Sequence, residues 1–185
     1  MRMVTKKAEV LDHLKAVGYD KEDYRIAVEA LIFTPDGKLL LEKRGPLCKD
    51  AVGLLEGVGG GLDEHDEDLH EALRHEISTE LSGLNGDLRV SIDRLLEIRQ
   101  IQFEESKTKR LKEWVVVSYL CKLIEGEPVS GEPELIEELV YLTLDELYAK
   151  PESELSGSTI AARKVYQEKY GNRPYFEVPE SPDGR

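Results

Sequence analysis

Cysteine and tryptophan are scarce in this sequence, which has two cysteines, Cys48 and Cys121, and a single tryptophan in 185 residues. Two cysteines cannot form the disulfide framework that stabilises small secreted domains. Also missing is any run that approaches the roughly 18 consecutive apolar residues of a membrane span. The first residues, MRMVTKKAEVLDHLK, lack the apolar stretch of a signal peptide. These absences predict a cytoplasmic protein with no membrane partner.

Basic residues are outnumbered, because 25 lysines and arginines face 38 aspartates and glutamates, for a net charge of -13. Such a field repels nucleic acid unless a local basic patch overrides it. The richest basic run, Lys107–Lys112, is short and is expected at a solvated hairpin tip. We therefore expect no nucleic-acid partner. The same field repels phosphorylated substrates, so an enzyme acting on them would need metal ions to reverse the local sign.

The length and the apolar patterning predict one α/β domain with a single mixed sheet between helices. We expect a helical extension over residues 1–22, a domain over residues 23–170 and an extended or loosely ordered tail over residues 171–185. Apolar spacing and turn residues predict the following elements: a helix over 5–17; strands over 24–34 and 38–44 joined by a Pro-Asp-Gly turn; a glycine-rich loop over 53–61; a helix over 67–82; long strands over 88–103 and 110–124 with a hairpin tip at 104–109; a loop over 125–134; a short strand over 139–143; a helical turn over 144–150; and a closing helix over 157–170 capped by Ser158 or Thr159.

Three glycines at residues 59–61 lead into an acidic helix that carries the chemistry. On this helix, Glu76 and Glu80 are four residues apart, so they project from one side, one turn apart. Most such pairs are solvated acids on a helix surface. The preceding glycines favour a ligand site, because they allow the backbone to approach a ligand closely. Carboxylate, carbonyl and water oxygens are the ligands that Mg²⁺ and Mn²⁺ prefer.

This segment resembles the Nudix hydrolase family, whose box is written G-x5-E-x7-R-E-U-x-E-E-x-G-U, where U is a bulky aliphatic residue. Gly61, Glu67, Glu76, Ile77 and Glu80 match the box directly. The likeness extends over about residues 24–150 and implies the family's fold, an α/β/α sandwich with a mixed central β-sheet. It also implies an enzyme that uses Mg²⁺ or Mn²⁺ to cleave the diphosphate linkage of a nucleoside diphosphate derivative.

The resemblance implies a role for each matching residue. Glu76 and Glu80 would be metal ligands, with Glu76 or a late-loop glutamate as the candidate base, and Glu67 would tie the loop to the helix. The remaining assignments are a carbonyl ligand from Gly61, an added ligand from Glu134 or its neighbour Glu132, and substrate contacts from Arg44, Gly60 and Gly61.

Three positions depart from the box. His75 stands where the family has arginine, Thr79 replaces the first glutamate of the E-E pair, and Gly83 falls one residue late. His75 can still donate a hydrogen bond to Glu76 and stays a catalytic candidate, and the Thr79 hydroxyl can still coordinate a metal without adding charge. Because ligand charge sets metal affinity, we expect activity to need millimolar metal or to favour Mn²⁺ over Mg²⁺.

Two functions remain open at this point. The first is the metal-dependent hydrolase, favoured by the intact Glu67, Glu76 and Glu80. The second is a catalytically weak or inactive Nudix module that binds a nucleotide-like ligand, favoured by Thr79 and His75. The histidines at 65, 70 and 75 are five apart and do not form the zinc motif H-E-x-x-H. The first 20 residues lie outside the resemblance and could serve a homodimer contact.

Overall fold

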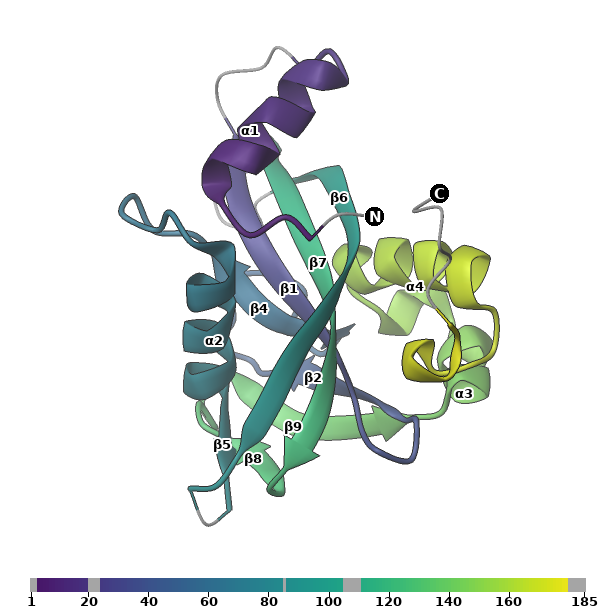
Figure 1. Cartoon of the computed structure of the whole chain (residues 1–185). Helices are drawn as coiled ribbons and strands as arrows, with labels where there is room; N and C mark the ends of the chain where they lie inside the picture. Colours follow the sequence, from purple (N-terminus) through teal and green to yellow (C-terminus); the bar gives the residue numbers. More distant parts are fainter. Residues whose placement is uncertain (1–2, 20–23, 85, 105–110, 180–185) are drawn as a thin grey trace.

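A mixed β-sheet lies between two helical layers in the computed structural model, which describes residues 3–19, 24–84, 86–104 and 111–179 (Figure 1). Helix α2 covers one face, and helices α3 and α4 cover the other. The predicted α/β sandwich is thus confirmed. Its elements are α1 (Lys7–Ala16), β1 (Arg25–Phe33), β2 (Leu39–Arg44), β3 (Leu55–Glu56), β4 (Val58–Gly61), α2 (Leu69–Glu80), β5 (Leu81–Gly83), β6 (Arg89–Glu104), β7 (Leu111–Glu125), β8 (Pro128–Ser130), β9 (Ile136–Leu142), α3 (Leu144–Ala149) and α4 (Gly157–Tyr170), with 3-10 turns at Glu152–Glu154 and Tyr175–Glu177.

Strand β1 is the centre of the sheet. It runs parallel to β7 and antiparallel to both β4 and β2, while β6 pairs with β7, and β2 pairs with β3 and β9. Residues 27–30 of β1 pair with β4, and residues 32–33 pair with β2, so both neighbours share one edge of β1. The glycine-rich segment is therefore a strand of the sheet, and the prediction of a loop over 53–61 is wrong for its second half.

Alternating side chains divide the core into two layers, because successive residues of a strand point to opposite faces. On β1, Ile26, Val28, Ala30 and Ile32 pack with α1 and α2, while Leu31 and Phe33 pack with α3 and α4. On β2, Leu40 belongs to the first layer, and Leu39 and Leu41 belong to the second. The same alternation directs Glu42 towards the α2 face and Glu29 towards the α4 face.

Several predicted elements are confirmed, with local corrections. The hairpin between β1 and β2 turns at Gly37, whose φ of +85° lies in the left-handed region. The predicted helix over 67–82 is shorter, because residues 81–83 leave it to form β5, which pairs with β8 inside the predicted loop over 125–134. The cap of α4 is Ser156, not Ser158 or Thr159, since the Ser156 hydroxyl accepts a hydrogen bond from the Thr159 N–H.

Both ends of the described chain are packed. Val10 and Leu14 of α1 are buried in the layer that contains α2, and the Tyr119 hydroxyl donates to the Val4 carbonyl at 2.7 Å. Tyr175 is only 1 % exposed and packs in the α4 layer, so the predicted tail is anchored to the domain at this residue. The predicted hairpin tip and most of the basic run Lys107–Lys112 lie outside the described residues. Among the helices that the structure describes, none is long and apolar enough to cross a membrane.

Helix α2 begins with a side-chain cap that fixes where its carboxylates lie. Asp68 accepts hydrogen bonds from the His70 and Glu71 N–H groups at 2.9 and 3.0 Å and forms an ion pair with Lys6. We expect Asp68→Ala to lower the free energy of unfolding by about 1 kcal/mol, the usual effect of losing an N-cap. Urea denaturation would measure it. Glu67→Ala is the matched control and should change stability by less than about 0.5 kcal/mol, because Glu67 is exposed. Equal losses of stability in the two variants would contradict the assignment of Asp68 as the N-cap.

Candidate functional site

The glycines of β4 and the carboxylates of α2 are in direct contact. The Gly59 N–H donates a hydrogen bond to Glu80 Oε2 at 2.8 Å. The Glu76 carboxylate lies so close to Gly60 that a Cβ atom on that residue would be 2.6 Å from Glu76 Cδ. A side chain at position 60 would therefore have to displace the Glu76 carboxylate from its present place. The structure thus brings together the glycines and the two glutamates that the sequence singled out.

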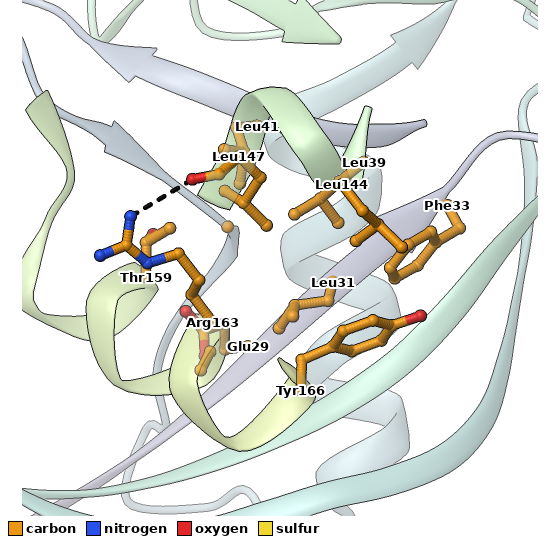
Figure 2. A pocket seen from close by; sticks show the side chains of 12 residues that line it. Glu29, Leu31, Phe33, Leu39, Leu41, Leu144, Leu147, Thr159, Arg163 and Tyr166 are labelled. Atoms are coloured by element: carbon orange, nitrogen blue, oxygen red, sulfur yellow. Dashed lines mark hydrogen bonds between the residues drawn. The ribbon is translucent and has the colours of Figure 1, made fainter. Parts of the chain in front are cut away.

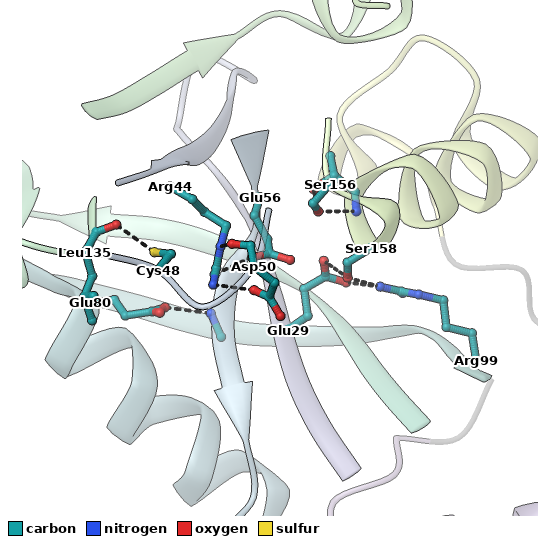
Figure 3. A network of polar contacts seen from close by, with 12 residues as sticks. Glu29, Arg44, Cys48, Asp50, Glu56, Glu80, Arg99, Leu135, Ser156 and Ser158 are labelled. Carbon is teal, nitrogen blue, oxygen red and sulfur yellow. Dashed lines mark hydrogen bonds and ion pairs between the residues drawn. The ribbon is translucent and has the colours of Figure 1, made fainter. Parts of the chain in front are cut away.

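Strands β2 and β3 add two further carboxylates. Glu42 is 4 % exposed and pairs in register with Glu56 across the antiparallel ladder. Among the described residues, Glu42 Oε1 has no hydrogen-bond partner. Glu56, by contrast, is held by Arg44, whose Nη1 donates to Glu56 Oε2 at 2.6 Å (Figure 3). The site therefore contains one strand carboxylate that is paired with a guanidinium and one strand carboxyl group with an oxygen that has no partner.

Burial and mutual repulsion raise the pKa values of this cluster. Burial, reinforced by the charges of Glu42, Glu76 and Glu56, raises the pKa of Glu80 to about 9, although the Gly59 hydrogen bond opposes the shift. Burial and the charges of Glu56, Glu132 and Glu76 raise the pKa of Glu42 to about 8, against the effect of Arg44. Burial also raises the pKa of Glu76. Because the groups are coupled, they titrate together, and a cation among them would relieve the repulsion.

The cluster predicts that the metal-free protein loses stability as pH rises. A carboxylate whose folded pKa lies above its unfolded value of 4.5 binds more protons in the folded state. By linkage, its contribution to stability is complete below the unfolded pKa and is lost as pH rises through the folded pKa, here towards about 8 to 9. The melting temperature, followed between about pH 5 and pH 9, should fall more in the native protein than in Glu80→Gln. Parallel curves for the two proteins would contradict this.

Two departures from the family box lie at the solvent surface. His75 is exposed, and its charge lowers the pKa of Glu76 but does not cancel the effect of burial. Thr79 is also exposed, and its hydroxyl donates to the His75 carbonyl at 2.9 Å, which turns it back onto its own helix. Gly61 lies against Trp114, because a Cβ on that glycine would be 2.8 Å from the indole ring. These three are not in contact with the Glu80 carboxylate in the structure.

The remaining predicted residues differ in how they relate to the cluster. The Arg44 guanidinium is already paired with Glu56 and with Asp50, the latter at 2.9 Å. Glu134 is exposed, whereas Glu132 is half-buried, and its charge raises the pKa of both Glu42 and Glu76. Of the two late-loop glutamates, Glu132 is therefore the one coupled to the site. Glu67 contributes its backbone carbonyl, which accepts from the Lys7 N–H at 3.0 Å, and its neighbour Asp68 supplies the side-chain link to the helix.

Sequence reasoning missed Glu42 and Glu56. A signal was present for Glu42, because it directly follows three consecutive leucines in a strand where a buried charge is unexpected. Glu56 had no comparable signal, since its strand is two residues long and is defined by pairing with the distant residues of β2.

The donor set fits a divalent cation, although it is not preassembled. Nowhere in the described chain do three or more His, Cys, Asp and Glu side chains form a group already arranged to hold a metal ion. Three observations nevertheless fit a metal-binding site. They are the Glu42 oxygen without a hydrogen-bond partner, the space that Gly60 leaves for the Glu76 carboxylate, and the mutual repulsion of Glu42, Glu76 and Glu80. Such oxygen donors suit Mg²⁺ and Mn²⁺.

A second polar network occupies the other face of the sheet, where a guanidinium lies among the acidic groups. Glu29 accepts from Arg99 Nη2 at 2.8 Å and from the Ser118 and Ser158 hydroxyls at 2.6 and 2.7 Å (Figure 3). Burial alone would raise the pKa of Glu29, but Arg99 and the two hydroxyls lower it below its ordinary value. Glu29 also borders an apolar pocket between the sheet and helices α3 and α4, lined by Leu31, Phe33, Leu39, Leu41, Leu144 and Leu147 (Figure 2). Among the described glutamates, the buried side-chain oxygen without a hydrogen-bond partner belongs to Glu42, on the α2 face.

The comparison with protein families agrees with this geometry. The sequence model of the NUDIX domain matches residues 23–163, which is more than half of the chain. The chain belongs to the Nudix family. A search of curated proteins gives no match.

Solved Nudix structures share the fold of this Nudix domain. A MutT Nudix hydrolase from Burkholderia pseudomallei is 28% identical, with a TM-score of 0.59, and the match covers 78% of this chain and 98% of that one. A UDP-X diphosphatase is 22% identical, with a TM-score of 0.54 and coverage of 89% and 73%. The Nudix domain of Shewanella oneidensis NrtR, solved with ADP ribose, is 18% identical, with a TM-score of 0.58 and coverage of 90% and 99%.

Proposed function

We propose that this Nudix domain hydrolyses the diphosphate linkage of a nucleoside diphosphate derivative with the help of Mg²⁺ or Mn²⁺. The observation that carries the proposal is the contact between Glu76, Glu80 and the glycines of β4, in a cluster of acidic groups that raise one another's pKa. The residues of this chain that match the Nudix box resemble those of hydrolases. The similar solved structures include a MutT hydrolase and a UDP-X diphosphatase.

A divalent ion bound at this cluster would neutralise phosphate charge and activate a water molecule. The side chains of the site have separate tasks. Glu80 is oriented by the Gly59 N–H, and Glu76 is positioned against Gly60, so both carboxylates face the same small region. Glu132 and Glu76 are the candidate bases, because both are partly buried beside the cluster. Water attacks one phosphorus and the bond to the bridging oxygen breaks, which yields two phosphate-bearing products.

The test is a hydrolysis screen with the purified full chain. Nucleoside diphosphate sugars, ADP ribose, nucleoside triphosphates and dinucleoside polyphosphates would each be incubated with Mg²⁺ or Mn²⁺, and the phosphorylated products quantified. Turnover of at least one class in a metal-dependent manner is expected. No turnover of any class at millimolar Mn²⁺ would overturn the proposal.

A second candidate function is ligand binding without cleavage. It is favoured by Thr79, which turns its hydroxyl away from the cluster and adds no charge to it. The NrtR Nudix domain was solved with ADP ribose bound, which offers a ligand to test. Calorimetric binding of ADP ribose, with no product formed over hours in Mn²⁺, would support this candidate over the hydrolase.

A further inference from the structure

Helix α2 presents one carboxylate fewer to the site than the family box provides. Thr79 stands at the missing position, is exposed, and uses its hydroxyl for a hydrogen bond to the His75 carbonyl. The helix therefore brings only Glu76 and Glu80 to the glycines of β4. Two carboxylates are a weak set for a divalent ion, because affinity depends on the charge of the ligands.

Strand β2 brings a third carboxylate to the same face. Glu42 follows Leu40 by two residues, and Leu40 packs in the layer that contains α2, so strand alternation directs Glu42 to that layer as well. Glu42 pairs in register with Glu56, and the glycines of β4 begin three residues beyond Glu56. The short connection through Gly57 therefore keeps Glu42 beside the segment that contacts Glu80.

A purely structural role does not account for Glu42. A buried carboxyl group normally has a hydrogen-bond partner for each oxygen, because burying an unpaired polar atom is costly. Glu29, the other glutamate buried in a central strand, has partners for both oxygens, since Arg99, Ser118 and Ser158 all donate to it. The nearest guanidinium to Glu42 along its strand, Arg44, is bound to Glu56 and Asp50. Within the described residues, Glu42 Oε1 has no partner.

We propose that Glu42 supplies from β2 the carboxylate ligand that position 79 of α2 lacks, so that Glu42, Glu76 and Glu80 hold the divalent ion between strand and helix. The inference rests on the proposed function, because it concerns the same ion. The three side chains do not form a ready-made group in the structure. Rotation about their side-chain bonds is therefore part of binding.

Metal affinity, measured without substrate, tests the inference. Free Mn²⁺ would be quantified by electron paramagnetic resonance during titration of the native protein, Glu42→Gln, Glu80→Gln and Glu138→Gln. Glu138 is an exposed residue of β9 that pairs with Lys43 of β2. Its variant therefore removes one charge from the same region without touching the cluster. We expect binding to weaken at least about tenfold in Glu42→Gln and Glu80→Gln, and to be unchanged in Glu138→Gln. Adding Thr79→Glu to Glu42→Gln should restore most of the affinity.

The outcomes separate the two claims. If Glu80→Gln weakens binding and Glu42→Gln does not, the role of Glu42 is overturned while the proposed function stands. If the native protein binds no Mn²⁺ at millimolar concentration, the role of Glu42 and the proposed function are both overturned. The native protein provides a check that does not depend on a variant folding: in crystals soaked with Mn²⁺, the anomalous peak should lie at bonding distance, about 2.1 Å, from a Glu42 oxygen. A peak bonded to Glu76 and Glu80 alone would also overturn the inference.

Discussion

Replacing Glu80 with glutamine is expected to lower kcat for diphosphate hydrolysis by at least about a hundredfold, which corresponds to roughly 3 kcal/mol of lost transition-state stabilisation. Glu80 is partly buried, its Oε2 is fixed by the Gly59 N–H, and its charge is coupled to those of Glu42 and Glu76. Glutamine keeps the shape of the side chain but removes the charge that would bind the ion. The measurement is kcat, with the substrate that the hydrolysis screen identifies, at saturating Mn²⁺.

The matched control is Glu71→Gln, which removes an exposed carboxylate from the same helix. Its rate should stay within about twofold of the native rate, because a charge in the first turn of α2 lies outside the cluster and is screened by solvent. Equal rates for the native protein and Glu80→Gln would show that any hydrolysis comes from elsewhere. Only the binding function would then remain for this site.

Replacing Arg99 with methionine should lower the free energy of unfolding by about 3–5 kcal/mol, the usual result of removing one partner of a buried ion pair. The Arg99 side chain is 8% exposed and pairs with Glu29, whose side chain is 6% exposed, and also with Glu97 at 2.7 Å. It donates to the Ser118 hydroxyl as well. Methionine would remove the cation that Glu29 pairs with and one of the cations near Glu97. Urea denaturation near neutral pH would measure the loss.

The double variant Glu29→Met with Arg99→Met should lose less stability than Arg99→Met alone, because no charge from the central pair stays buried. Acid provides a second check. In the native protein the pKa of Glu29 is lowered, so its stabilising contribution is present above the unfolded pKa of 4.5 and is lost as pH falls through the folded value. The difference between native and Arg99→Met should therefore shrink in acid. A constant difference would argue that packing, and not charge, accounts for the loss.

The elements that sequence predicted well are those specified by local pattern. The hairpin turn at Gly37 and the helices α2 and α4 follow from turn chemistry and from apolar residues repeated at helical spacing. Strands β4, β5 and β8 could not be predicted in this way, because they contain glycine or proline, which have low strand propensity. β4 exists because β1 offers its edge to residues 58–61, and β5 exists because β8 pairs with it. Those partners are distant in sequence.

The same distinction applies to the site. Glu76 and Glu80 were predictable because a helix places residues four apart on one side. Glu42 and Glu132 join them only through strand pairing and loop path, which no local spacing records. Strand pairing likewise sets the surroundings of Arg44: its predicted substrate contact stays a prediction, and in the fold its guanidinium forms ion pairs with Glu56 and Asp50.

Helix α1 lies outside residues 23–163, where the family's sequence pattern is found, but it is part of the same hydrophobic layer as α2. Its preceding residues also form the strand-like bridge between Lys6 and Asp68, and Leu69 donates its N–H to the Thr5 carbonyl. The packed unit is therefore longer than the part of the chain that matches the family. A fragment trimmed to that part would expose one wall of its interior, and the helix that carries Glu76 and Glu80 would lose the support at its first turn.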